Sequence, residues 1–468
     1  MLLKSGLLSD STKEVAGGGA PADRRAVGGG GAAADSRAVT NRRVVAEVAE
    51  AAAGGADQYD GETNEKGEYH GKGKLTLPDG YFDGDWENGV FVKGKVKLTY
   101  KEGSTYEGDW ENDNEHGKGT INYADNHFYA GDWENGRFHG HGTMVVADGE
   151  TYIGGFCNGN YHGEGRLTTP NQSYTGEFQN GVYHGEGTLT YSDGSTYEGA
   201  FIDDMRHGHG TRTIADEEVY VGNYENDKKH GQGKCTYSNG STYNGQWENG
   251  VYHGRGTQTY PDESTYVGEF QNGMRHGTGT LTYPDGSTLY EGEFQNGMKH
   301  GQGKCTYSNG STYNGQWENG VYHGNGMYTY PDESTYVGKF QHGVYHGHAI
   351  FTYSDGSTYV GEFKDDKRHG HGTRKYTDEE EYVGNYENDF ENGHGKYTYS
   401  NGSTYEGEFV DGYPCGKGNF KDTSGKKFKG VFEFNSEAVQ LIMTDKKGQT
   451  LIFDVQINRY ENPLLADQ

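Results

Sequence analysis

Residues 230–254 read HGQGKCTYSNGSTYNGQWENGVYHG, and the same 25 letters return without a change at residues 300–324. Within each copy, STYNGQW alternates so that Tyr, Gly and Trp fall on one face of an extended strand. E-N-G follows as a two-residue turn that favours positive φ. H-G-Q-G-K-C-T-Y is a second extended run, and S-N-G is another turn. The stretch therefore predicts the second strand of one β-hairpin followed by the first strand of the next.

The pattern aromatic-x-Gly-x-aromatic extends this reading along most of the chain. Its first residue recurs every 22 to 24 residues, usually 23, and the spacing predicts a repeat architecture. In the first unit Thr63 stands where the second aromatic belongs. The 17 first residues are Tyr59, Phe82, Tyr106, Tyr129, Tyr152, Tyr174, Tyr197, Tyr220, Tyr243, Tyr266, Tyr290, Tyr313, Tyr336, Tyr359, Tyr382, Tyr405 and Phe428.

These repeats predict an all-β fold, an elongated single-layer antiparallel β-meander of about 17 stacked hairpins. About 34 strands at roughly 4.8 Å each give an upper length near 160 Å. The chain has 80 glycines, most of them at fixed positions in the two strands. Glycine normally weakens a strand, but bare backbone allows a neighbouring ring to lie over it. Because a lone hairpin is unstable, each unit must gain stability from its neighbours.

Composition divides the chain into three parts. Residues 1–56 are rich in Gly and Ala and are predicted to be a disordered tail with a short helix near residues 42–53. Residues 57–430 form the repeat array. Residues 431–468 are more aliphatic and are predicted to supply two or three strands that cap the open edge of the sheet.

Charge and cysteine usage bound the partners and the compartment. The formal net charge is −28, and an acidic surface disfavours nucleic acid and anionic lipid. No apolar run is long enough to span a membrane, and the first residues, MLLKSGLLSDSTKEV, do not resemble a signal peptide. The four cysteines lack C-x-x-C spacing, which suits a reducing compartment. We therefore expect a cytoplasmic protein.

The unit Y-x-G-x-W-x-x-G-x-x-H-G-x-G, repeated every 23 residues, resembles the MORN (membrane occupation and recognition nexus) repeat over roughly residues 57–430. The resemblance implies a coiled antiparallel sheet and a role in interaction and scaffolding, as in the radial-spoke-head proteins of cilia. Some MORN proteins carry a lipid kinase domain, a methyltransferase domain or a membrane anchor, but the motifs of those segments are missing from this sequence. The array-only members are the ones that this chain is similar to.

Several residues could be mistaken for chemical sites. Histidines in H-G-H-G runs would be about 9–10 Å from their equivalents in the next hairpin, too far to converge on one zinc ion. A ladder of structural hydrogen bonds near the turn is the better interpretation. Cys235 and Cys305 lie three hairpins apart, which excludes a disulfide between them in a regular array, so they are expected to replace the Leu or Met of other units. We expect no catalytic residue, no cofactor and no metal.

The sequence favours a non-enzymatic scaffold that binds other proteins in a ciliary or cytoskeletal assembly. The partner is expected to be a peptide or helix along an aromatic groove, and side-by-side pairing of two arrays stays open. The alternatives are a peripheral lipid binder, which the acidic charge disfavours, and a regulatory subunit of a lipid kinase or methyltransferase. The aromatic face offered as the partner site comprises Tyr243, Trp247, Tyr266, Phe270, Tyr290, Phe294, Tyr313 and Trp317.

Overall fold

The structure is a computed structural model that describes residues 58–100, 102–146, 148–435 and 440–454. The predicted tail and its helix near residues 42–53 lie outside these residues, as do residues 455–468 of the predicted cap. The described residues form 35 strands. They divide into two compact units, one that ends at Val251 and one that begins at Tyr252.

The first unit contains eight hairpins and the first strand of a ninth. The first strands are β1 (Gln58–Thr63), β3 (Gly80–Glu87), β5 (Thr105–Glu111), β7 (Phe128–Glu134), β9 (Thr151–Cys157), β11 (Gln172–Gln179), β13 (Thr196–Ile202), β15 (Glu218–Glu225) and β17 (Thr242–Glu248). The second strands are β2 (Tyr69–Leu77), β4 (Val90–Thr99), β6 (Asn114–Asn122), β8 (Arg137–Val145), β10 (Asn160–Thr168), β12 (Val182–Tyr191), β14 (Met205–Ile214) and β16 (Lys228–Tyr237).

The second unit continues the same alternation of short and long strands. Its strands are β18 (Val251–Thr259), β19 (Thr265–Gln271), β20 (Met274–Thr282), β21 (Thr288–Gln295), β22 (Met298–Thr306), β23 (Thr312–Glu318), β24 (Val321–Thr329), β25 (Thr335–Gln341), β26 (Val344–Thr352), β27 (Thr358–Lys364), β28 (Lys367–Lys375), β29 (Glu381–Glu387), β30 (Phe390–Thr398), β31 (Thr404–Val410), β32 (Tyr413–Lys421), β33 (Lys427–Asn435), β34 (Gln440–Thr444) and β35 (Thr450–Asp454).

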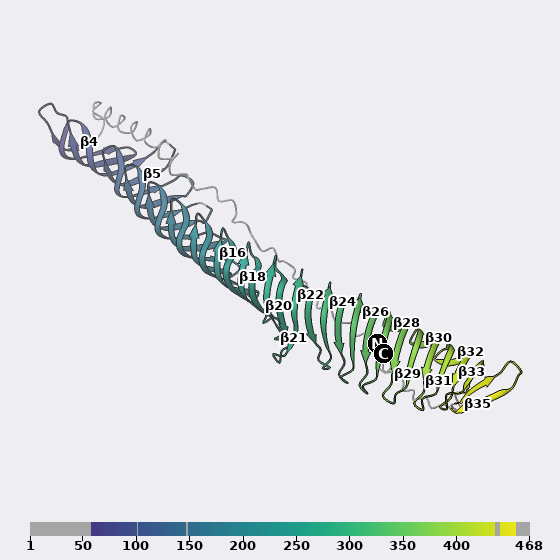
Figure 1. The fold of residues 1–468 in the computed structure, drawn as a ribbon. Coiled ribbons are helices and arrows are strands. Elements are labelled where there is room, and N and C mark those ends of the chain that lie inside the picture. The colour runs from purple at the N-terminus through teal and green to yellow at the C-terminus, as the bar shows by residue number, and fades with distance from the viewer. Residues whose placement is uncertain (1–57, 101, 147, 436–439, 455–468) are drawn as a thin grey trace. The chain divides into compact units, whose positions relative to one another are not determined.

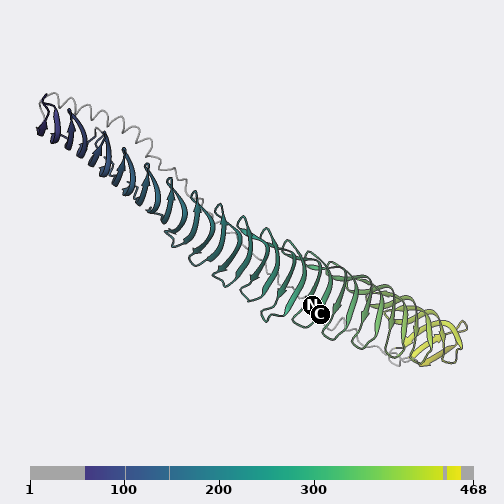
Figure 2. The same ribbon diagram turned by 60° about the vertical axis from the view of Figure 1, so that its left-hand side comes forward.

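Within each unit, every strand pairs antiparallel with the strands before and after it in the sequence. Figures 1 and 2 show this succession, with the turns of each unit along the two margins of a single layer. The predicted antiparallel β-meander is confirmed. No strand crosses over another in either unit, because turns of a few residues can join only neighbouring antiparallel strands.

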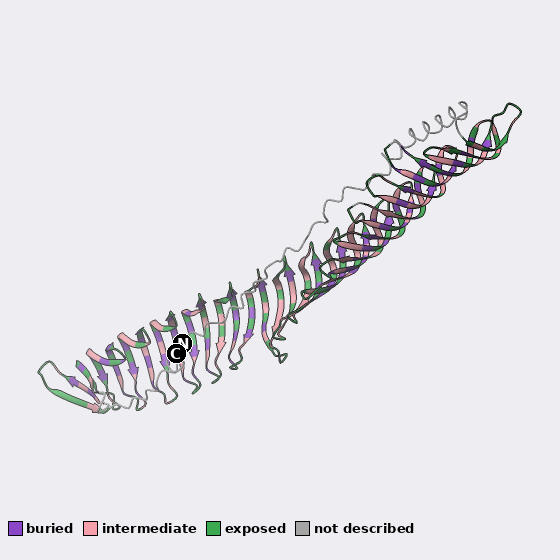
Figure 3. Cartoon of the chain, turned by 180° about the vertical axis from the view of Figure 1, so that it is seen from behind, coloured by how far each residue is buried: buried purple, intermediate pink, exposed green. Residues whose placement is uncertain are grey.

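The two faces of the sheet differ in burial, which alternates along each strand (Figure 3). One face, here called the ring face, carries the aromatic side chains at the two aromatic positions of the 23-residue repeats. In β9, for example, Tyr152 and Phe156 are buried, while Ile153 between them is exposed. The opposite face is called the open face. It carries the residues that alternate with the rings.

The glycines of the repeat lie under the tyrosine rings. Gly154 of β9 pairs with Gly165 of β10, and a Cβ on Gly165 would lie 2.4 Å from the Tyr152 hydroxyl oxygen. The same hydroxyl donates a hydrogen bond to the carbonyl of Gly155 at 2.9 Å. The phenol therefore covers two bare backbone segments and satisfies its own polar atom, as the expected ring-over-glycine packing requires.

The H-G-x-G run differs from the uninterrupted strand that the alternation predicts. In β7 and β8, Gly131 pairs with Gly142 and Asp132 pairs with His139, so the register shifts and Gly140 and His141 have no partners in β7. Gly140 has a φ of +58°, which favours glycine. The Asp132 carboxylate accepts the backbone N–H of His141 at 2.9 Å. The run is therefore a β-bulge whose free N–H is satisfied by a side chain.

The two predicted turns form as expected. At the N-G turns both residues have positive φ, for instance +50° at Asn135 and +76° at Gly136. The glycine N–H also reaches the preceding hairpin, as Gly136 donates to the Glu115 carbonyl at 2.9 Å. At the other margin, the Asp or Asn side chain of D-G-S and N-G-S accepts the serine N–H, as Asp193 does from Ser195 at 2.8 Å. The N-G-S tripeptides are thus explained as turn residues.

After the repeats, β33, β34 and β35 continue the meander, and a capping role for residues 431–468 stays a prediction. Leu441 and Met443 of β34 are buried. Leu451 and Ile452 of β35 are exposed.

Candidate protein-binding faces

The eight aromatic residues predicted to bind a partner all lie in the ring face. Tyr243 and Trp247 belong to the first unit, and the other six belong to the second. Their exposed fractions lie between 0 and 4 %. Partner contact through these rings stays a prediction, but their burial leaves little of their surface for another protein.

Their polar atoms are bonded within the sheet as well. The Tyr243 hydroxyl donates to the Gln246 carbonyl at 2.7 Å, and Trp247 Nε1 donates to the Gly233 carbonyl at 3.0 Å. The two rings meet edge to face with centroids 5.2 Å apart. Tyr313 and Trp317 repeat these contacts in the second unit at 2.7, 3.1 and 5.1 Å. These geometries mark a packing layer.

The residue before His-Gly is a variable position on the ring face. Where it is aromatic, it stacks on the tyrosine of its own hairpin, as Tyr161 does on Tyr152 at 3.8 Å. Where it is basic, it lies over two rings, as Lys229 does over Tyr220 at 4.9 Å and Trp247 at 4.8 Å. A flat ring and a cation can fill the same space because both are attracted to an aromatic face.

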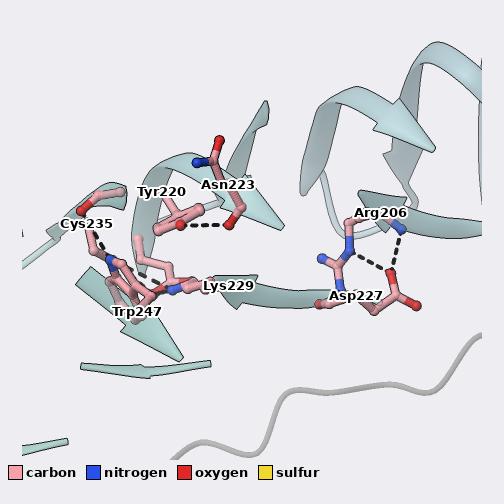
Figure 4. Close-up of polar contacts among 9 residues, drawn as sticks. Arg206, Tyr220, Asn223, Asp227, Lys229, Cys235 and Trp247 are labelled. Carbon is pink, nitrogen blue, oxygen red and sulfur yellow. Dashed lines mark hydrogen bonds and ion pairs between the residues drawn. The ribbon is translucent and has the colours of Figure 1, made fainter. Parts of the chain in front are cut away.

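Lys229 belongs to a polar group that the sequence did not reveal (Figure 4). Its ammonium pairs with Glu218 at 2.9 Å and lies 3.8 Å from the Cys235 thiol. Cys235 is fully buried between Tyr220 and Tyr243, which confirms that it occupies a Leu position. Burial, the largest cause, raises the pKa of Cys235 to about 11. This thiol therefore stays protonated and unreactive at neutral pH.

Figure 4 also shows an ion pair between neighbouring hairpins. Arg206 Nε lies 2.9 Å from Asp227 Oδ1, and the same oxygen accepts the Arg206 backbone N–H at 2.9 Å. Arg368 and Asp389 repeat the pair in the second unit at 3.3 and 2.9 Å. In both copies Asp replaces the glycine of the N-G turn, with φ of +68° and +75°. The repeated R-H-G-H-G-T-R and E-N-D sequences were the available signal.

A second buried polar group lies on the ring face between β26 and β30. The Arg374 guanidinium stacks on the Tyr353 ring at 3.4 Å and donates to Ser357 Oγ at 3.0 Å. The buried Glu380 carboxylate accepts the Tyr397 hydroxyl at 2.6 Å. The contact of Arg374 with Tyr353 reaches the preceding hairpin, whereas the other two lie within one hairpin each, and we assign all three a structural role.

The histidines lie beside the N-G turns, where a structural ladder was expected. His116, His139, His230 and His323 each approach the glutamate that precedes the turn of the same hairpin, at 3.1 to 3.6 Å. Within residues 58–454, apart from the masked positions, no three His, Cys, Asp or Glu side chains gather in a way that could hold a metal ion. The histidines that approach these glutamates are therefore part of the structure beside the turns.

The open face has a different chemistry in different stretches of the chain. In β2 to β7 it carries cross-strand ion pairs, among them Lys72–Asp85 at 2.5 Å, Lys95–Asp109 at 2.7 Å and Lys118–Asp132 at 2.5 Å. Lys95 and Lys118 also line a shallow depression of about 510 Å³, together with Tyr81, Glu107, Gly108, Gly119, Thr120 and Gly131. Such exposed pairs contribute little stability individually.

In β24 to β29 the open face carries a row of apolar side chains instead. Met327, Val337, Ile350 and Val360 lie in register on four consecutive strands, each with 43 to 48 % of its surface exposed. The ring and glycine positions that define the repeat do not reveal this row, because its members lie between them in the sequence. The signal was present in the residue that precedes or follows each strand glycine, where other units carry mostly Thr, Glu, Asn or Lys.

Among the described residues, no helix could cross a membrane.

Comparison with known families gives one extensive match. The model of the MORN repeat matches fifteen segments that together cover more than half of the chain. The matched residues are 65–80, 106–128, 129–151, 152–173, 174–196, 197–218, 220–242, 243–265, 266–288, 290–312, 313–335, 336–358, 359–380, 382–404 and 405–427. No curated protein matches the chain.

Solved structures show only weak likenesses. The TCP domain of SAS-4 (dCPAP) of Drosophila melanogaster, in complex with a proline-rich motif of Ana2 (dSTIL), is 12% identical over 38% of this chain and 83% of that chain, with a TM-score of 0.18. The TCP10 domain of Danio rerio CPAP is 11% identical over 61% and 96%, with a TM-score of 0.11. A streptogramin B lyase is 12% identical over 55% and 86%, with a TM-score of 0.12. With TM-scores this low, we draw no conclusion from them.

Proposed function

Because this chain belongs to the family of MORN-repeat proteins, we propose that it is a non-enzymatic scaffold that binds other proteins in a cytoplasmic ciliary or cytoskeletal assembly. A repeat array is a non-catalytic fold whose surface extends with every added unit. The setting follows from the resemblance to array-only MORN proteins such as those of radial-spoke heads.

The observation that carries the proposal is the contrast between the two faces. The ring face repeats the same packing in every unit, with Tyr106, Tyr152, Tyr243 and Tyr313 all fully buried. The open face changes from an ion-pair ladder in β2 to β7 to an apolar row in β24 to β29. A constant interior under a changing surface supports separate docking stretches along one framework, because specificity resides in exposed side chains.

Proximity labelling by the full chain in its native cell tests this proposal. We expect recovery of cytoskeletal or axonemal proteins, with the tagged chain located on those structures. Recovery of a lipid kinase or methyltransferase at equal stoichiometry would favour the regulatory-subunit alternative. Salt-sensitive flotation with anionic vesicles, without protein partners, would favour the lipid-binding alternative and overturn the scaffold.

A further inference from the structure

The open face of β24 to β29 carries a continuous stripe of side chains at one register position. Met327 pairs with Val337, Val337 with Ile350, and Ile350 with Val360. The stripe continues through Thr373 and Val383 on the next two strands. We call Met327, Val337, Ile350, Val360 and Val383 the apolar row, in which Thr373 is the one polar position.

Among the described residues of the first unit, no comparable row occurs at this position. Ile153 there pairs with Thr143 and Arg166, and Val221 of the same unit pairs with Thr211 and Lys234. Neither residue has an apolar partner on the adjacent strands, although Val219 lies beside Val221 on β15, and exposed apolar side chains without such partners are ordinary on protein surfaces. Four exposed ones in unbroken register are not, and they indicate a contact surface.

Polar rows flank the apolar row on both sides. Thr329, Thr335, Thr352 and Thr358 pair in sequence along one side. On the other side, Asn325 pairs with Lys339, and His348 pairs with Glu362 at a salt-bridge distance of 3.6 Å. The surface thus has an apolar centre one side chain wide with polar borders, as protein interfaces do.

The geometry of the row selects the kind of partner. Each of the strands β24 to β29 is paired on both sides, so its backbone cannot hydrogen-bond an added extended peptide. A helix satisfies its own backbone. Six strands span about 24 Å at roughly 4.8 Å per step, which equals about 16 helical residues, and the helical pitch of about 5.4 Å nearly matches that step.

Charge selects among helices and argues against a second copy. Residues 321–387 hold six Lys or Arg and eleven Asp or Glu, so this stretch attracts a cationic partner and repels its own duplicate. An apolar stripe bordered by Lys and Arg on a short helix would complement both the row and its field.

We propose that the apolar row of β24 to β29 docks a basic amphipathic helix of a partner protein. This inference rests on the scaffold function proposed above and names one docking stretch and its ligand chemistry. The helix lies across the strands, with one apolar side chain per turn against the row and basic side chains over the exposed carboxylates of the adjoining turns, among them Asp332, Glu333 and Asp355. The first unit lacks such a row, so the interaction is confined to the second unit.

Binding of a model peptide to the full chain tests the proposal. The probe is a fluorescent helix of about 16 residues, with leucines at i, i+3, i+4 and i+7 spacing and lysines elsewhere. The variant carries Ile350→Thr and Val360→Thr, which keep β-branched side chains and remove apolar surface. The matched control carries Ile153→Thr and Val221→Thr, the same changes at open-face positions that have no apolar partner on the adjacent strands. Circular dichroism verifies that each variant retains its sheet.

We expect the row variant to bind the peptide at least about tenfold more weakly than the parent chain and the control variant to bind it unchanged. A scrambled peptide of the same composition and a Leu/Glu peptide with the same stripe should both bind poorly. Equal binding by the row and control variants, equal binding of the scrambled peptide, or no binding at all would overturn the docking site. Sedimentation showing a dimer that the row substitutions dissociate would replace the helix by a second copy.

These outcomes are separable from the fate of the scaffold proposal. If the peptide fails but proximity labelling still recovers cytoskeletal partners, the apolar row is not the docking stretch and the scaffold stands. If labelling recovers none, the scaffold fails whether or not the peptide binds.

Discussion

At the scale of single residues, the tyrosine and the two glycines of each hairpin form one packing element. Tyr152 covers Gly154 and Gly165 and bonds the Gly155 carbonyl. A methyl group on either covered glycine would collide with the phenol or with the facing backbone. The abundance of glycine in this chain is therefore a requirement of close ring packing, which outweighs the weakness of glycine in strands.

We expect Gly165→Ala to destabilise β9 and β10 by about 1–3 kcal/mol, because an added Cβ would lie 2.4 Å from the Tyr152 hydroxyl. Amide hydrogen exchange of these strands measures the effect. Glu164→Ala, at the exposed neighbouring position, serves as the control and should change exchange little. Equal protection in the two variants would show that the ring does not occupy the space above Gly165.

Trp133 allows the ring face to be tested at a second position. It donates from Nε1 to the Gly119 carbonyl at 3.1 Å and contacts Tyr106, Tyr129 and Phe138. We expect Trp133→Ala to cost about 3–5 kcal/mol locally and Trp133→Phe to cost less. Limited proteolysis should show new cleavage in β6 to β8 of the alanine variant. Unchanged resistance there would contradict a packing role.

At the scale of elements, hairpins are joined by bonds from the turn of one hairpin to the strand of the preceding one. In most hairpins the donor of this bond is a glycine N–H, as in the bond from Gly136 to the Glu115 carbonyl. Asp227 and Asp389 add a carboxylate that accepts the N–H of the arginine before His-Gly. Glycine would adopt the positive φ of these two positions at lower cost, but the Asp carboxylate adds a charged contact between hairpins. We call each of these Arg–Asp contacts a clip.

The two clips differ in burial, which gives a comparative prediction. The Arg368–Asp389 side chains are 11 and 14 % exposed, against 16 and 28 % for Arg206–Asp227. Asp→Asn at each site keeps the turn conformation and an acceptor oxygen but removes the charge. We expect a loss of about 1.5–3 kcal/mol at Asp389 and a smaller loss at Asp227. Hydrogen exchange of the Arg368 and Arg206 amides would report the order, and the reverse order would contradict it.

At the scale of the whole molecule, the ring face gives a shared response to alkali. Burial is the largest cause that raises the pKa of the fully buried tyrosines above the ordinary value. Tyr106, Tyr266 and Tyr382 are examples. A raised pKa in the folded state contributes stability that is present below the unfolded value near 10 and is lost as pH rises above it. The fold should therefore fail in alkali.

We expect phenolate absorbance to lag behind that of free tyrosine as pH rises above about 10 and then to increase together with loss of β-sheet circular dichroism. The urea-unfolded chain, which lacks burial, serves as the reference and should titrate near the ordinary value. Full ionisation near pH 10 with the sheet intact would contradict the burial of these hydroxyls.

Repeat architecture also predicts that a destabilising substitution weakens only its own hairpin and the neighbouring hairpins. Each strand contacts mainly its sequence neighbours, so stability is close to a sum of nearest-neighbour terms. Trp133→Ala should leave hydrogen exchange in β28 to β32 unchanged. A uniform loss of protection across both units would show that the array unfolds as one cooperative body.

The sequence by itself determined the hairpins, their antiparallel order and the common face that Tyr, Gly and Trp share, because period-two alternation and N-G turns are local properties repeated along the array. Only the tertiary structure decided what depends on neighbouring hairpins: the bulge at Gly140, the Arg206–Asp227 clip, and the burial of Trp247 and Tyr313, which the sequence had offered as a partner surface. The apolar row has the same origin. Val337, Ile350 and Val360 are 10 to 13 residues apart in the chain, and only the register of β25 to β27 brings them side by side.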